Sequence, residues 1–507
     1  MTPKQPSDER QVSHFLPSQL LLLVEHQGTL SGDQLVRLIN RSNHALQDAH
    51  LSPRRVISFP QTRAHTDFSL VFTDVYGVED QPAELLPLIK QLEVLFDQPD
   101  QQVTLRAVSP NWQSERAPLI TGWGPGAEPI PAPKLAERWH KSKIDDLDTP
   151  FGFTLPALPV GDGAKTGVEV AIMDTAPCVH DLIHAYNTWQ EDHPLIRSLL
   201  RPGGQLEITY ASLEEHLRLS RYTIKNRDAM GDHGLFVAGI IHTIAPHARL
   251  NLIEVLNPFG IGDIESLAVG LQSLLQRPSS QSLIVNCSLV VNIPQPEERE
   301  ALAAIDPAWN SVAPEQIRRM SWPLEWMFNV LHDRDVLVIA AAGNDADTNH
   351  RPAARYPAAL DCVIGVGALE RDSDLAVYTN IADSPASQGF VTIGGDAANG
   401  KALPNTGMLG IYIGTFPNGR RSTTGWAWWA GTSFAAPVIC GSLTMLLGHG
   451  KPSTQALQIL RDAEGATTAQ GEEIFSVQQG RTPRHAPSNG VASGDNAEYV
   501  DMTKQRG

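Results

Sequence analysis

The 507-residue sequence contains only four cysteines, Cys178, Cys287, Cys362 and Cys440, and they are widely separated. None belongs to a Cys-x-x-Cys pair or to a Cys/His spacing typical of a zinc site. Most lie inside apolar runs, which is typical of buried reduced thiols in a reducing compartment, with a long-range disulfide between Cys362 and Cys440 as the alternative. No acidic cluster indicates a bound metal, and we expect no cofactor.

Positive charge and long apolar runs are also scarce. The 39 Lys and Arg residues are outnumbered by 56 Asp and Glu residues, for a net charge of −17 at neutral pH. This balance argues against nucleic acid or an anionic membrane surface as a partner. No run approaches the ~20 apolar residues of a membrane-spanning helix. The run LLLLV near the N-terminus is shorter than a signal-peptide core and lacks a small-residue cleavage site. We therefore predict a cytoplasmic protein.

No internal repeat of about 20 to 50 residues divides the chain, and its length predicts two or three domains. Residues 19–108 follow the order strand, helix, strand, strand, helix, strand, and the first helix begins with a capping-box pattern, Ser31 with Gln34. This order is typical of the ferredoxin-like arrangement. We therefore expect a small ferredoxin-like α+β domain over residues 1–108.

From residue 166 the pattern changes to short apolar runs, such as VEVAIM, LNLIEVL and LVIAAAG, that alternate with helical patterns. This alternation predicts an α/β domain over 166–465, a doubly wound, mostly parallel sheet with helices on both faces. The functional sites of such folds lie beyond the carboxyl ends of the strands. A Pro- and Gly-rich linker is expected before this domain, over 109–165, and a poorly ordered tail after it, over 466–507.

Four polar residues follow or open these elements. Asp174 follows VEVAIM, Asn344 follows LVIAAAG, His233 opens an apolar helix and Ser433 precedes the run FAAPVIC. Each alone has an ordinary explanation, as a turn former, a structural histidine or a helix cap. Together they supply the carboxylate, amide donor, imidazole and hydroxyl of nucleophilic acyl transfer. We expect Ser433 to be the nucleophile, His233 the general base, Asp174 its orienting group, and Asn344 an oxyanion donor together with the Ser433 amide.

The order Asp, His, Ser differs from that of the α/β-hydrolases, which run Ser, Asp, His and have a Gly-x-Ser-x-Gly elbow. The chain resembles the subtilisin-like serine proteases, or subtilase family, through the segments VAIMDTAP, DHGLFVAGII, LIVNCSLV, LVIAAAGN, YPAALDCVIGVGAL and GTSFAAPVICGSL. The resemblance implies a serine endopeptidase that forms an acyl-enzyme on a protein or peptide substrate. The same chemistry would also serve an esterase or a peptide ligase.

The resemblance also implies where substrate binds. An extended peptide would pair beside the segment SLVV, and the implied substrate-binding residues are Ser288, Leu289, Val290, Ala341 and Gly343. Arg351 falls near the expected floor of the primary specificity pocket. If it points inward, it favours an acidic residue before the scissile bond, and the alternative is that it lies in solvent.

Departures from the family pattern matter as well. Leu235 and Phe236 stand where Thr and a second His are usual, and Val290 stands where Gly is usual. A Cβ at position 290 narrows the cleft and predicts restricted specificity. The long segments 181–230 and 293–325 are expected to shape a restricted substrate site. These departures also motivate the alternative function, an inactive pseudoprotease that only binds a peptide or protein.

Subtilases often carry a ferredoxin-like propeptide that assists folding and blocks the cleft with its C-terminal strand. The domain over 1–108 resembles this propeptide in topology, and the resemblance implies that the domain inhibits the protease within the same chain. Self-cleavage would then fall within 109–165. The alternative is a permanent regulatory or partner-binding domain, which a cytoplasmic location favours. Family members often bind calcium, but no acidic cluster of this sequence supports such a site.

Overall fold

The computed structural model describes residues 15–59, 67–77, 85–100, 102–116, 127–134, 167–220, 231–276, 282–347, 350–370, 374–386, 389–463 and 475–478. Most of the linker predicted over 109–165 and most of the tail predicted over 466–507 lie outside these residues. Four strands of the first sheet come from the N-terminal part of the chain, and two short strands from after residue 166 pair with its edge; the second sheet comes from the part after residue 166.

The N-terminal part forms an antiparallel sheet in the strand order β4-β1-β3-β2. Its elements are β1 (Phe15–His26), α1 (Gly32–Ala45), β2 (His50–Ser58), β3 (Asp67–Tyr76), α2 (Leu85–Leu92), a 3-10 helix (Glu93–Leu95) and β4 (Val103–Arg116). The capping box is present, because Ser31 and Gln34 each accept a hydrogen bond from the other's backbone N–H. Leu20 to Val24 of β1 are buried because helices contact this sheet on both faces.

The second sheet is mostly parallel, as the sequence predicts. Its strand order is β19-β14-β13-β12-β10-β6-β8-β7, and β19 is its antiparallel strand among those described. The strands are β6 (Val168–Asp174), β7 (Leu206–Thr209), β8 (Arg249–Glu254), β10 (Ser282–Cys287), β12 (Leu337–Ala341), β13 (Ile364–Leu369), β14 (Gly389–Ile393) and β19 (Phe475–Gln478). Strand β19 lies within the segment predicted as a tail, so that segment contributes an edge strand.

Helices cover both faces of the parallel sheet. One face packs against α7 (His233–Ile244) and α11 (Thr432–Gly448), the other against α8 (Ile264–Leu275) and α10 (Pro314–His332). Side chains of β6 alternate between the faces, since Val170 and Ile172 belong to one apolar cluster and Ala171 and Met173 to the other. The remaining helices of eight or more residues are α4 (Val179–Trp189), α6 (Leu213–Ser220) and α12 (Ser453–Asp462), and α5 (Pro194–Leu199) and α9 (Arg299–Ile305) are shorter.

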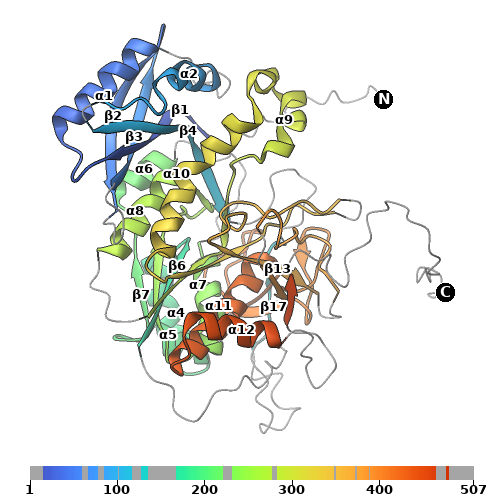
Figure 1. Ribbon diagram of the computed structural model, residues 1–507. Coiled ribbons are helices and arrows are strands. Elements are labelled where there is room, and N and C mark those ends of the chain that lie inside the picture. Colours follow the sequence, from blue (N-terminus) through green and yellow to red (C-terminus); the bar gives the residue numbers. More distant parts are fainter. Residues whose placement is uncertain are drawn as a thin grey trace, which may run out of the picture.

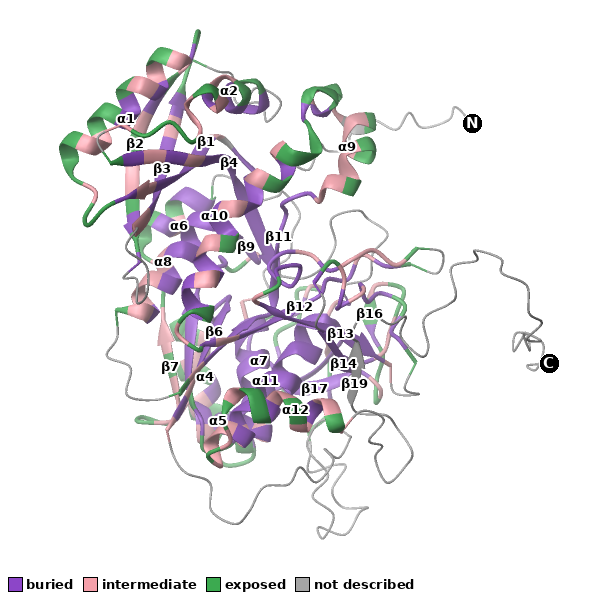
Figure 2. Cartoon of the chain, in the orientation of Figure 1, coloured by how far each residue is buried: buried purple, intermediate pink, exposed green. Residues whose placement is uncertain are grey.

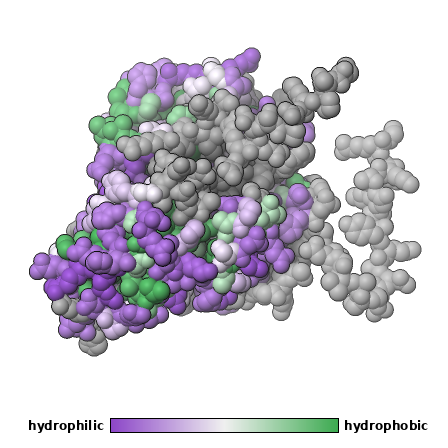
Figure 3. Space-filling model, turned by 90° about the horizontal axis from the view of Figure 1, so that it is seen from above, coloured by the Kyte–Doolittle hydropathy of each residue, from purple (hydrophilic) through white to green (hydrophobic). Residues whose placement is uncertain are grey.

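Helices α8 and α10 lie between the two sheets (Figure 1). They contact β1, β2 and β4 on one side and β6 and β12 on the other. One apolar core cluster therefore extends from the N-terminal domain through these helices to the parallel sheet, and Figure 2 shows the buried residues along this path. Seen from above, most of the described surface is hydrophilic, with small separate hydrophobic patches (Figure 3). The shared core indicates that the two domains stabilise each other.

Strand β4 continues past the domain boundary predicted at 108. Its last residues lie between two short strands of the second domain, β9 (Ile261–Asp263) and β11 (Leu289–Val291). Residues 113–115 pair with β9 and residues 114–116 pair with β11, both antiparallel. Trp112 holds the strand in place, because its buried ring meets Phe15 edge-on at 5.2 Å and stacks on Trp309 at 6.4 Å. The continuation of the strand past residue 108 was not predicted, because Pro110 and the polar residues around it are typical of a linker.

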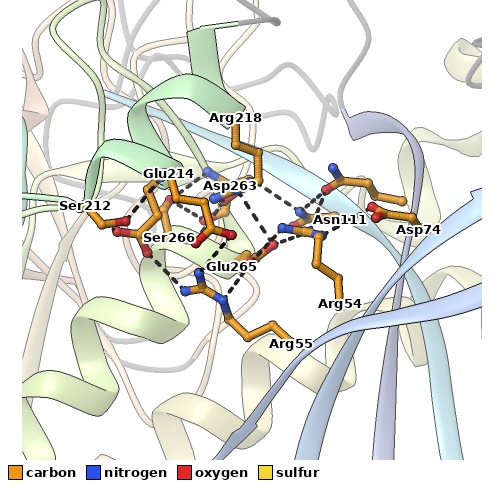
Figure 4. A network of polar contacts seen from close by, with 12 residues as sticks. Arg54, Arg55, Asp74, Asn111, Ser212, Glu214, Arg218, Asp263, Glu265 and Ser266 are labelled. Carbon is orange, nitrogen blue, oxygen red and sulfur yellow. Dashed lines mark hydrogen bonds and ion pairs between the residues drawn. The ribbon is translucent and has the colours of Figure 1, made fainter.

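A buried ion network joins the domains (Figure 4). Arg54 of β2 donates to Glu265 on α8 at 2.9 Å, and Nε of Arg55 lies 3.1 Å from the same carboxylate. The side chain of Glu265 is 0 % exposed. Arg218 of α6 donates to Asp263, which caps the N-terminus of α8. Since an unpaired buried carboxylate is costly, these contacts favour the docked arrangement of the two domains.

Replacement of Arg54 by Gln tests this network. The change should lower the free energy of unfolding by about 2 to 4 kcal/mol, because Glu265 loses its bidentate partner while remaining buried. The matched control is Arg318→Gln, whose partner Glu315 lies on the same exposed helix surface, and we expect a loss of about 0.5 kcal/mol or less there. Chemical denaturation measures both, and equal small losses would contradict the structural importance of the network.

Candidate active site

Ser433 is the second residue of the buried helix α11, and the N-cap is Gly431. The serine is 1 % exposed. Its hydroxyl does not cap the helix but donates to the backbone oxygen of Ser288 at 3.2 Å. Because the first turn of a helix carries the positive end of its dipole, this position suits a group beside which negative charge develops.

A proline later in α11 explains how the backbone of Ser433 is held. Pro437 has no N–H, so the carbonyl of Ser433, four residues earlier, lacks its usual helical partner. The hydroxyl of Ser288 donates to this carbonyl at 2.8 Å, and Asn286 Nδ2 donates to the Ser288 hydroxyl at 2.9 Å. Ser288 was predicted only as a substrate-binding residue, and it also fixes the helix tip. Pro437 in the sequence predicts that the carbonyl of Ser433 lacks its helical partner. No sequence pattern predicts the role of Asn286.

Asp174 and His233 contact each other at the carboxyl ends of the parallel strands. Asp174 is the last residue of β6, and His233 is the first residue of α7. Nδ1 of His233 lies 2.8 Å from Oδ1 and 2.9 Å from Oδ2 of Asp174, and Oδ1 also accepts the N–H of Thr175 at 2.7 Å. A proton on Nδ1 satisfies this contact and leaves Nε2 able to accept one. The rings of Trp429 and Phe434 each lie 5.2 Å from the imidazole and restrict its position.

Asn344 lies beside the tip of α11. Its Oδ1 accepts the N–H of Thr432 at 2.9 Å, and the N–H of Gly343 donates to the Thr432 hydroxyl at 3.3 Å. The amide nitrogen of Asn344 is 3.4 Å from the place that a Cβ on Gly431 would occupy. The carboxamide is therefore anchored by its oxygen, with its nitrogen next to the segment that precedes Ser433. Asp174, His233 and Ser433 lie at a strand end or at helix tips, and Asn344 lies in the loop after β12.

Comparison with known proteins identifies the family. The sequence model described as "Subtilase family" matches residues 165–480, more than half of the chain. The chain belongs to the subtilase family. This membership confirms the resemblance found in the sequence and supports a serine-type peptidase with the α/β fold described above.

Two known relatives match this subtilase. Subtilisin DY from Bacillus licheniformis is 24% identical over 260 residues, which are 49% of this chain and 75% of that protein. Minor extracellular protease Epr from Bacillus subtilis (strain 168) is 29% identical over 172 residues, 32% of this chain. That match covers 21% of Epr.

Solved structures are similar at lower levels. A lanthipeptide protease has 20% identity and a TM-score of 0.39, and the match covers 59% of this chain and 81% of that one. The patellamide maturation protease PatA has 21% identity and a TM-score of 0.37, with 59% and 86% covered.

The remaining residues predicted to bind substrate lie in different places in this subtilase. Leu289 and Val290 belong to β11 and pair with the end of β4. Ala341 is buried inside β12 in the apolar core, so its side chain supports the sheet. The guanidinium of Arg351 donates to the backbone oxygens of Ala376 and Thr379 at 3.0 and 2.5 Å. This arginine thus binds the loop after β13, and its place at the floor of a primary specificity pocket stays a prediction.

A different arginine lies against the predicted site. Cγ of Arg355 is 3.0 Å from the place that a Cβ on Gly343 would take. Its backbone N–H donates to Ala342 at 2.9 Å, and its guanidinium pairs with Asp345 at 3.0 Å. Sequence position alone could not distinguish Arg351 from Arg355, because the turn between them decides which one reaches Gly343.

Asp232, directly before His233, was also missed from the sequence. Its Oδ2 accepts the backbone N–H groups of Ile413 and Gly414 at 2.7 and 2.5 Å. Burial raises the pKa of this carboxyl to about 6, although the two hydrogen bonds favour its charged form. The contact ties the N-terminus of α7 to the segment after β17 (Met408–Ile411). Asp232 is therefore a positioning residue for the histidine.

Replacement of Asp232 by Asn tests the raised pKa of this carboxyl. The folded state keeps its proton up to about pH 6, while the unfolded state releases it near its ordinary pKa of 3.8. Wild-type stability should therefore fall, relative to Asp232→Asn, as the pH rises through this window, by roughly 2 to 3 kcal/mol. Denaturation curves of both proteins at several pH values measure the difference, and a constant difference would contradict the raised pKa.

All four cysteines are free, and Cys287 and Cys440 are buried as expected, whereas Cys178 is exposed. The alternative of a Cys362–Cys440 disulfide is therefore wrong for this structure. Within the described ranges, no cluster of three or more His, Cys, Asp and Glu side chains is arranged to hold a metal ion. No helix in the described part of the chain has both the length and the apolar character that crossing a membrane requires.

Proposed function

We propose that this subtilase is a serine endopeptidase that uses Ser433, His233 and Asp174. The observation that carries the proposal is the buried pairing of Asp174 with Nδ1 of His233 beside the tip of α11. His233 accepts the Ser433 proton at Nε2 as Oγ attacks the peptide carbonyl. The tetrahedral intermediate then collapses, the C–N bond breaks and the leaving amine takes the proton from His233. Water, activated by the same imidazole, hydrolyses the acyl-enzyme.

The oxyanion of the intermediate would be bound by the Ser433 N–H and the Asn344 amide. Anchoring of the Asn344 oxygen on Thr432 supports this role, because it fixes the orientation of the carboxamide. The dipole of α11 adds to the stabilisation of the negative charge. Neither donor has to move far during the reaction, which is the property that makes such sites effective.

The alternative, an inactive pseudoprotease that only binds peptides or proteins, is motivated by Leu235 and Phe236. Both are fully buried in the apolar core. The ring of Phe236 packs 5.5 Å from Trp429 and 4.8 Å from Phe434, and these rings also contact His233. This packing indicates that Leu235 and Phe236 change the apolar packing behind His233 and leave the histidine in place. We therefore prefer the enzyme. Val290 supports a restricted specificity, because it lies in the strand that pairs with β4 and its side chain narrows the cleft there.

We also propose that the N-terminal domain is ferredoxin-like and inhibits the peptidase from within the same chain. The element order and the antiparallel order β4-β1-β3-β2 support the fold. Pairing of residues 114–116 with β11 supports inhibition, because the chain's own strand then uses the edge on which an extended substrate is expected to pair. A cytoplasmic location remains a proposal, supported by the free cysteines.

Contacts of the two long segments support a domain that stays bound. Segment 181–230 supplies α6, whose Glu215 lies 3.2 Å from Arg55 of the N-terminal domain. Segment 293–325 supplies Trp309, which stacks on Trp112. Both segments were expected to shape the substrate site, and these contacts place parts of both against the N-terminal domain. Such contacts are suited to a regulatory domain.

A small fluorophosphonate probe tests the nucleophile. We expect the wild type to be labelled at Ser433, Ser433→Ala to stay unlabelled, and His233→Ala to react about 10³-fold or more slowly, because the hydroxyl then loses its general base. Mass spectrometry identifies the labelled residue. A folded wild type that stays unlabelled, even when the domain contacts are weakened as below, would contradict the enzyme and favour the pseudoprotease.

Weakening the domain contacts tests the inhibition. Arg54→Gln should increase the rate of Ser433 labelling by a peptide-based phosphonate about tenfold, because the end of β4 would leave the cleft more often. Arg318→Gln, which removes only an exposed pair with Glu315, serves as the control and should label as the wild type does. Equal rates in all three proteins would show that the N-terminal domain does not limit access.

A further inference from the structure

Glu115 is a buried carboxylate in the cleft between β9 and β11. It lies in the last part of β4, opposite Ile261 on one side and Val290 on the other. The residue is only 4 % exposed. Burial of a charged carboxylate is unfavourable unless the surroundings supply donors or positive charge. The walls of the cleft must therefore stabilise this particular side chain.

Asn292 supplies the donor. It follows β11 directly, and its Nδ2 donates to Oε1 of Glu115 at 2.6 Å. Its backbone N–H also donates to the backbone oxygen of Gln113 at 2.9 Å. One residue of the cleft wall thus binds both the main chain and the acidic side chain of the strand that occupies the cleft.

Arg355 supplies positive charge. It lies between the two strands that flank the site, because its N–H binds Ala342 after β12, while the next residue, Tyr356, accepts the N–H of Val291 at 2.7 Å. Burial alone would lower the pKa of its guanidinium, but Asp345, and to a smaller extent Glu298 and Glu115, raise it above its ordinary value. Glu115 makes the smallest of these contributions, and the hydrogen bond from Asn292 is the direct contact to its carboxylate.

We propose that the cleft selects substrates with a glutamate or aspartate at the position that pairs with Val290, and that Asn292 and Arg355 recognise this side chain. The inference rests on the proposed function and names its substrate class. Both recognition groups belong to the catalytic domain, so they remain when the end of β4 leaves. The empty cleft then presents the amide donor of Asn292 to the incoming peptide, and the positive charge of Arg355, whose guanidinium stays paired with Asp345, favours a carboxylate there. Glu115 occupies the place of that substrate residue.

Hydrogen exchange of the full chain tests the recognition without relying on catalysis. Glu115→Gln and Asn292→Leu should each accelerate exchange of the backbone amides of residues 113–116 about tenfold, since each removes a charge-assisted hydrogen bond. The double variant should exchange little faster than either single variant. Ser114→Ala, in the same strand but without the carboxylate contact, is the matched control and should exchange as the wild type does. Unchanged exchange in both single variants, or additive effects, would overturn the proposal.

Peptide cleavage tests the specificity. The full chain carrying Glu115→Gln, in which the strand is held less tightly, is given fluorogenic peptides in which Glu or Gln occupies each position in turn. We expect one position at which Glu raises kcat/KM about tenfold over Gln, and loss of that preference when Asn292→Leu is added. Cleavage without such a preference would overturn the inference and leave the peptidase intact. If no peptide is cleaved and Ser433 is never labelled, the proposed function fails, and the exchange cycle alone decides whether the cleft recognises a carboxylate.

Discussion

Strand β4 takes part in two sheets at once, and the arrangement of the whole molecule depends on this shared strand. Its first half pairs with β1 in the N-terminal sheet, and its last residues pair with β9 and β11. Trp112 lies at the transition and is fully buried. Because one continuous backbone forms both sets of hydrogen bonds, the N-terminal domain cannot shift without disturbing the substrate cleft. Helices α8 and α10 and the ion network around Glu265 then fix the angle at which this domain docks.

The candidate catalytic residues are rigid for reasons that lie outside the residues themselves. Pro437 withholds a backbone hydrogen bond from α11, and Ser288 supplies the replacement to the carbonyl of Ser433. Asp232 ties the start of α7 to the segment after β17, and aromatic rings surround the imidazole of His233. One buried polar contact thus holds the helix tip on Ser288, and separate ones hold the start of α7. Such support is what preorganised catalysis requires.

Local patterns in the sequence predicted the parallel sheet, the capping box of Ser31 and the positions of Asp174, His233 and Ser433, because apolar periodicity and chain order carry this information. The pairing of residues 113–116 was missed, since a strand that completes another domain's sheet shows no periodicity of its own. Arg355 and Asn292 were missed for a related reason. The turns beside them decide in which direction their side chains point, and therefore what they contact. Arg351 and Arg355 show the same limit, because the turn between them decides which one lies against Gly343.

The central claim, a competent serine nucleophile in a cleft occupied by its own chain, is tested most directly by comparing two probes on the unaltered protein. A small fluorophosphonate needs only the nucleophile, its histidine and the oxyanion donors, whereas a tetrapeptide phosphonate must also pair with β11. The account predicts rapid labelling of Ser433 by the small probe and labelling by the peptide probe at least about tenfold slower than on a subtilisin of matched small-probe reactivity. Labelling by the peptide probe as fast as on that subtilisin, or no reaction with the small probe, would contradict it.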